Sequence, residues 1–172
     1  MKSIKYAFGF ILFINTSFNF AMEPHLSKLY RYRLFETEKY PNALRDFKAY
    51  LPKHGKVTFD NIWYAMYYGL EEAFGLLMTE AKNQNFDFNQ KNEATYGPTL
   101  LYLAVKFHHL FAVSLLLEQK ADPYIKTNEG LNAFDAAKEE LQDMKALKDS
   151  IPSDTPRYEI CLKISQLLEQ AK

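Results

Sequence analysis

A segment near the middle of the chain repeats part of itself at a fixed distance. The pattern Gly-x-Thr-x-Leu-x-Leu-Ala runs from Gly97 to Ala104, and a glycine and an alanine stand again 33 residues later, at Gly130 and Ala137. A period of roughly 20 to 50 residues is typical of proteins built from stacked supersecondary units. One such unit cannot bury its own apolar face, so the period predicts a row of units that pack against their neighbours.

The most regular unit spans residues 97–126. Its apolar residues recur at helical spacing over 100–107 and over 111–117, which predicts two short helices joined by a turn at His108 and His109. Ala121 and Asp122 then begin an extended loop. The expected unit is a pair of antiparallel helices followed by a projecting loop.

Neighbouring units are found by sliding this pattern along the chain. Residues 63–78 parallel residues 102–117 at an offset of 39. Gly69 then ends a first helix at a position suited to positive φ, a position that His108 takes in the regular unit. A third unit begins at Gly130 with its second helix near 160–171. The insertion between its helices includes an expected exposed loop at 148–156.

The order of these motifs resembles the ankyrin repeat, from Gly-x-Thr-x-Leu-x-Leu-Ala through Val-x-Leu-Leu-Leu in the second helix to Ala121-Asp122. The resemblance covers residues 58–172 and is strongest over 97–137. It implies an all-α fold, namely an ankyrin-like solenoid of about three helix-pair repeats. The family's Thr-Pro-Leu-His tetrapeptide is Thr-Leu-Leu-Tyr at residues 99–102, and Trp63 stands at the family's histidine position in the preceding unit.

Residues 22–57 form an expected N-terminal helical cap. Helical spacing over 26–35 and 42–51 predicts two helices separated by Tyr40-Pro41. Residues 52–55, which begin with Pro52, are expected to break the chain. Thr58 or Asp60 is then expected to cap the next helix.

Residues 1–21 have the three parts of a secretory signal peptide. Two lysines precede an apolar run at 7–14, polar residues follow, and Ala21 stands at the expected cleavage site. The apolar run is shorter than the roughly 20 residues that span a bilayer, although an uncleaved anchor is the alternative. The chain is therefore expected to be periplasmic or secreted, without stable membrane insertion after cleavage.

No motif in the chain predicts catalysis, a cofactor or a metal site. His108 and His109 are adjacent and point in different directions, so they make a poor metal pair, and the chain has no phosphate-binding loop or nucleophile motif. Cys161 is the only cysteine, and nothing in the sequence pairs it with a histidine, so a buried structural role is expected. The 21 basic residues balance 21 acidic ones, so net charge does not indicate a nucleic-acid partner.

The resemblance to ankyrin repeats also implies where a partner protein would bind. Partners of such stacks meet the projecting loops and the exposed side of the first helices. The positions that match are Trp63, Tyr67, Tyr68, Tyr102, Lys106, Phe107 and Glu139, with Glu140 beside them. The loop positions are Glu93, Thr95, Tyr96, Thr127, Asn128 and Glu129. Tyrosine and tryptophan are favoured as interface anchors, but Trp63 and Tyr102 could equally fill gaps between units.

Three functions follow as hypotheses from these features. The preferred one is an exported, non-catalytic protein-binding module, specifically an immunity or inhibitor protein that blocks a toxin or enzyme in the periplasm. The alternative is a secreted effector that engages host proteins through the same surface. An enzyme with its site in the insertions at 79–96 or 148–158 is disfavoured, because those loops hold no convergent acid, base and nucleophile.

Overall fold

The computed structural model describes residues 23–54, 56–92, 96–150 and 155–171. The predicted signal peptide at 1–21 lies outside these residues. Within them, the regular secondary structure is helical, apart from one isolated β-bridge that joins Lys91 to Thr99. The prediction of an all-α fold is confirmed.

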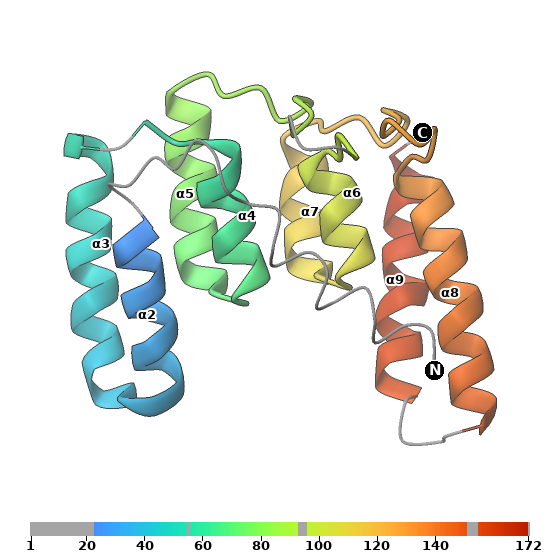
Figure 1. Ribbon diagram of the computed structural model, residues 1–172, viewed down its shortest axis with the longest axis horizontal. Coiled ribbons are helices and arrows are strands. Elements are labelled where there is room, and N and C mark those ends of the chain that lie inside the picture. The colour runs from blue at the N-terminus through green and yellow to red at the C-terminus, as the bar shows by residue number, and fades with distance from the viewer. Residues whose placement is uncertain (1–22, 55, 93–95, 151–154, 172) are drawn as a thin grey trace.

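The described helices form four consecutive antiparallel pairs (Figure 1). The pairs are α2 (Glu23–Phe35) with α3 (Tyr40–His54), α4 (Phe59–Tyr67) with α5 (Glu71–Asn83), α6 (Leu100–Lys106) with α7 (Leu110–Glu118), and α8 (Ala133–Ser150) with α9 (Thr155–Gln170). A short 3-10 helix, η2 (Thr37–Lys39), links α2 to α3.

The pairs stand side by side in a row. The first helices α2, α4, α6 and α8 contact one another in that order, and so do the second helices α3, α5, α7 and α9. The connections within the first three pairs lie along one edge of the row, and the longer loops that follow α5 and α7 lie along the opposite edge (Figure 1). One continuous core runs through the row, and its fully buried members include Phe47, Phe74, Leu100, Leu116 and Ile164.

All four helices of the two middle pairs end in the same way. The residue after each helix cap has a left-handed backbone, with φ of 63° at Gly69, 55° at Asn85, 58° at His108 and 62° at Lys120. In each case the N–H of the left-handed residue donates to the carbonyl of the residue three positions before it. The N–H of the following residue donates to the carbonyl five positions before itself, and these two bonds end the helix. Gly69 and His108 are 39 residues apart, so the predicted offset between these units corresponds to equivalent helix ends.

The spacing of about 33 residues corresponds to contacts between successive loops. The Asp122 N–H donates to Asn89 Oδ1 at 2.7 Å, across 33 residues. The Asn128 N–H donates to the Tyr96 carbonyl at 2.8 Å. Gly97 and Gly130 both have positive φ, at 52° and 83°. Residues about one period apart in the sequence therefore hydrogen-bond to each other and link neighbouring loops.

The ends of several helices differ from the prediction. The helix α3 continues through Pro52 to His54, although a break was expected at Pro52. Proline is tolerated there because it removes only one N–H from the last turn of a helix whose Phe47 and Leu51 are anchored in the core. Thr58 is the cap of α4: its hydroxyl accepts from the Asn61 N–H, while the Asn61 side chain accepts from the Thr58 N–H.

The last pair is longer than predicted. Residues 148–150 and 155–156 belong to α8 and α9, although a loop was expected there, and α9 begins five residues before the predicted start. At 1.5 Å per residue, the 18 residues of α8 span about 27 Å and the 7 of α6 about 10 Å. The insertion is thus used largely to lengthen helices, because Met144 and Cys161 keep the extended pair packed together.

Candidate protein-binding surface

Three predicted aromatic residues meet where α4 ends beside the end of α6. The Trp63 ring lies 5.0 Å from the Phe107 ring and 5.4 Å from the Tyr67 ring, measured between centroids. Tyr67 and Phe107 meet edge to face at 6.0 Å. Trp63 is 4% exposed, whereas Tyr67 is 41% and Phe107 is 37% exposed. Trp63 therefore fills the gap between two helix pairs and supports two exposed rings, which we call the aromatic edge.

Tyr68 has a different environment. Its ring stacks on Tyr30 of α2 at 4.5 Å and lies 6.0 Å from Tyr64. The side chain is half-buried. Tyr68 thus packs the N-terminal helix pair against α4, and its role as a partner contact stays a prediction.

A charged cluster joins the end of α6 to α8. Lys106 Nζ lies 3.1 Å from Glu139 Oε2 and also pairs with Glu140, which in turn lies 2.7 Å from His108 Nε2. Burial opposes the charge on Lys106, but hydrogen bonds and the charges of Glu140 and Glu139 raise its pKa overall. Burial likewise opposes the charge on Glu140, while His108 and Lys106 lower its pKa. The cluster is therefore ionised at neutral pH and ties neighbouring pairs together.

Cys161 has a histidine partner that the sequence did not predict. A hydrogen bond with Cys161, followed by the bond to Glu140, raises the pKa of His108 to about 9. The imidazole comes from the α6–α7 turn, the carboxylate from α8 and the thiol from α9. Cys161 is 2% exposed. A thiol, an imidazole and a carboxylate are the groups of a nucleophilic triad, but burial keeps this thiol from a substrate, so the arrangement brings together the α6–α7 turn and two helices.

The remaining predicted residues lie towards the loop edge. Tyr102 is half-buried, and burial raises its pKa; the charges of Glu139 and Glu129 add to that rise, while Lys106 lowers it. Tyr96 is 46% exposed, and Asn128 and Glu129 are also exposed. Tyr102 and Lys106 of α6 therefore share one neighbourhood with Glu139 of α8 and Glu129 of the loop between α7 and α8. Glu93 and Thr95 lie outside the described residues, and Thr127 is buried.

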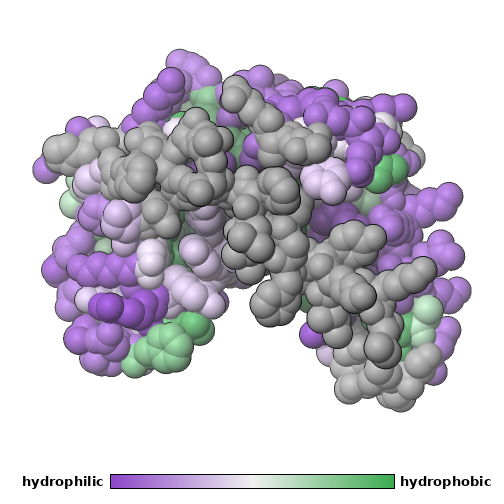
Figure 2. Space-filling model, in the orientation of Figure 1, coloured by the Kyte–Doolittle hydropathy of each residue, from purple (hydrophilic) through white to green (hydrophobic). Residues whose placement is uncertain are grey.

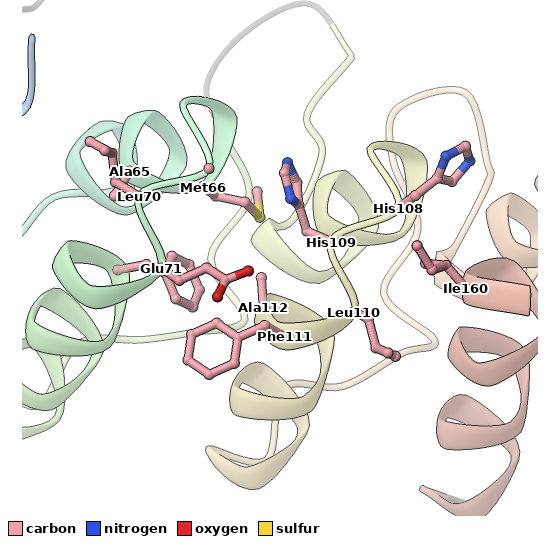
Figure 3. Close-up of a pocket in the computed structure, with 12 residues that line it drawn as sticks. Ala65, Met66, Leu70, Glu71, His108, His109, Leu110, Phe111, Ala112 and Ile160 are labelled. Atoms are coloured by element: carbon pink, nitrogen blue, oxygen red, sulfur yellow. The ribbon is translucent and has the colours of Figure 1, made fainter. Parts of the chain in front are cut away.

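A pocket of about 200 Å³ opens beneath the turns of the two middle pairs (Figure 3). Its walls include Met66, Leu70, His109 and Phe111, with Ile160 of α9 at one side. Figure 3 shows His109 beside Met66, while His108 points away towards the α9 side. Burial, with the charge of His108, lowers the pKa of His109, so this ring is neutral at pH 7. Sequence reasoning missed this pocket because its walls come from the ends of separate helices.

Among the described residues, no group of three or more histidine, cysteine or acidic side chains could hold a metal ion. None of the helices described is long and apolar enough to cross a membrane. The chain matches no family model, and no curated protein matches its sequence. The geometry alone therefore carries the functional argument.

Proposed function

We propose that the chain is an exported, non-catalytic protein-binding module of the ankyrin-repeat type. In this proposal it acts as an immunity or inhibitor protein that binds and blocks a toxin or an enzyme in the periplasm. The observation that carries the proposal is the row of helix pairs, in which first helices contact first helices and second helices contact second helices. Such a row presents an extended surface rather than an enclosed site, and surfaces of this type bind proteins.

The aromatic edge supplies anchors for such a partner. Tyr67 and Phe107 are each more than a third exposed, although both are large rings. Both rings pack against the Trp63 ring, so they are ordered before a partner binds. Ordered aromatic side chains lose little conformational entropy on binding, and such residues supply much of the free energy of association.

The charged cluster, which adjoins the aromatic edge, adds specificity to this surface. Glu139 is 58% exposed at its side chain, next to Lys106, at 30%. Exposed charges at the rim of an interface select partners of complementary potential and raise the rate of association. The aromatic edge and these two charges together define the surface on which we expect a periplasmic enzyme to be bound and blocked.

The proposal is tested by binding and inhibition. The partner sought is an envelope toxin or enzyme, first among the products of neighbouring genes, and its activity is titrated with the purified protein. We expect one-to-one inhibition, and a loss of affinity of about 100-fold in a Tyr67→Ala, Phe107→Ala variant, measured by titration calorimetry. Tyr124→Ala, which removes a 51% exposed ring on the loop edge, is the matched control and should bind normally.

Two results would contradict the proposal. If no envelope enzyme is inhibited, the immunity function is wrong. If the enzyme is inhibited equally by the double variant, the partner uses another surface. Fractionation gives a separate test, since mature protein found in the culture medium rather than the periplasm would favour a secreted effector.

A further inference from the structure

The zero net charge of the chain hides a separation of charge along the row. Residues 22–57 hold eight basic and four acidic residues, a net charge of +4. Residues 58–172 hold 11 basic and 17 acidic residues, a net charge of −6. The N-terminal helix pair is therefore a basic end on an otherwise acidic protein. Such asymmetry indicates that one end faces an anionic surface.

Two of the three basic residues of the helix α2, Lys28 and Arg31, lie on one face. Leu26 and Leu29 are buried in the core. Lys28, Arg31, Tyr32 and Phe35 follow at i, i+3, i+4 and i+7, so they share the opposite face. The Lys28 and Arg31 cations lie 5.6 Å and 5.1 Å from the centre of the Tyr32 ring, and Lys39 approaches the same ring at 5.8 Å.

The end of this face is apolar and open. Phe35 is 78% exposed, which is the largest value among the exposed large hydrophobic residues described, and Leu34 is 50% exposed. Figure 2 shows hydrophobic surface at this lower end of α2, beside strongly hydrophilic side chains. Glu36 pairs with Arg31 and Lys39, yet residues 24–39 still carry four basic and two acidic residues. Two adjacent apolar side chains at the tip of a basic helix match the chemistry of a bilayer interface.

We infer that the end of α2 docks the protein on an anionic membrane surface. Phe35 and Leu34 enter the boundary between headgroups and acyl chains, and Lys28, Arg31 and Lys39 lie over the anionic headgroups. A nucleic acid would be attracted by the same cations but offers no apolar layer for Leu34 and Phe35. This docking leaves the aromatic edge on α4 and α6 to the protein partner, so it does not depend on the proposed function.

The test is co-sedimentation of the purified full chain with vesicles of phosphatidylglycerol, with phosphatidylcholine vesicles as the comparison. All variants keep the same N-terminus, so differences between them report on α2. We expect binding to phosphatidylglycerol to weaken about tenfold in Leu34→Ser, Phe35→Ser and about tenfold in Lys28→Gln, Arg31→Gln. The controls are Tyr124→Ser and Lys138→Gln, Lys163→Gln, which change exposed residues of the same kinds elsewhere and should bind as the parent does.

The outcomes are distinct. Weakening by both α2 variants, with the controls unchanged, supports the inference. Equal binding by all variants, or equal binding to both lipids, overturns it. If binding depends on Lys28 and Arg31 but not on Leu34 and Phe35, and random-sequence duplex DNA competes with the vesicles, the basic end is a nucleic-acid site instead.

Discussion

His108 occupies a backbone conformation that most side chains avoid. Its φ is 58°, at the position where the preceding unit has Gly69. A left-handed backbone costs a non-glycine residue roughly 1–2 kcal/mol. The bond of its imidazole to Glu140, at 2.7 Å, offsets that cost by joining the α6–α7 turn to α8. The departure from glycine thus adds one more tie between the α6–α7 turn and the last pair, beside the ion pairs of Lys106.

This arrangement predicts a specific dependence of stability on pH. Because the pKa of His108 is raised to about 9 in the folded state, its contribution is complete below the unfolded value of 6.5 and is lost as the pH rises through about 9. We expect the parent to lose about 1–2 kcal/mol between about pH 7 and about pH 10, after allowance for solvent screening, and His108→Asn to lose less. Asparagine tolerates the left-handed backbone but cannot be cationic. Urea unfolding at both pH values measures the difference.

The control for this prediction is His25→Asn, because burial lowers the pKa of His25 and the ring is neutral throughout that range. A parent and a His108→Asn variant with the same pH dependence would show that the imidazolium does not stabilise the fold.

Two glycines give opposite predictions for the same substitution. Gly69 has φ of 63°, so Gly69→Ala should destabilise the protein by about 1 kcal/mol, although its Cβ would meet the nearest atom, on Arg33, at an ordinary 3.7 Å. Gly75 lies inside α5, and a Cβ there would meet nothing within 4 Å. Gly75→Ala should therefore stabilise by about 0.5–1 kcal/mol. Chemical unfolding at neutral pH compares the two variants. If both substitutions change the free energy of unfolding in the same direction, the left-handed backbone of Gly69 or the helical backbone of Gly75 is contradicted.

At the scale of the element, α4 depends on its cap. Thr58 and Asn61 satisfy each other's backbone N–H groups in a capping box at the start of α4. We expect Thr58→Ala to cost about 1 kcal/mol. Thr79→Ala is the matched control: its hydroxyl bonds only to the Gly75 carbonyl within α5, so the change should be close to neutral. If Thr58→Ala and Thr79→Ala have the same free energy of unfolding, the Thr58 cap does not stabilise α4.

The elements that sequence reasoning found are those with a strong local pattern. The helices of the middle pairs were predicted from apolar spacing, and the left-handed end of α4 from Gly69. The ends of α3 and α8 were missed because tertiary packing extends them beyond Pro52 and Lys148, where local rules predict a stop. The contact between His108 and Cys161 joins residues 53 apart, and no local pattern encodes it. The bond between His108 and Glu140 did have a sequence signal, since the two residues stand 32 positions apart, about one period.

At the scale of the whole molecule, the row of pairs predicts how instability spreads. Each pair is held mainly by its neighbours, so a row can open from one end while the rest stays folded. Leu116 in α7 and Leu168 in α9 are both fully buried, and they differ in position: one is central and the other is terminal. The same substitution at the two sites therefore separates local from propagated effects.

We expect Leu116→Ala and Leu168→Ala each to cost about 2–5 kcal/mol, since both remove a buried leucine. Hydrogen exchange followed by mass spectrometry should distinguish them. Leu168→Ala should raise exchange in α8 and α9 and leave α4 and α5 protected, because the loss lies at the end of the row. Leu116→Ala should raise hydrogen exchange in the helix pairs on both sides of α6 and α7, since α7 contacts both α5 and α9. If Leu168→Ala raises exchange equally in α4 and α5, the chain unfolds as one cooperative unit, and the basic N-terminal end cannot stay folded once the last pair opens.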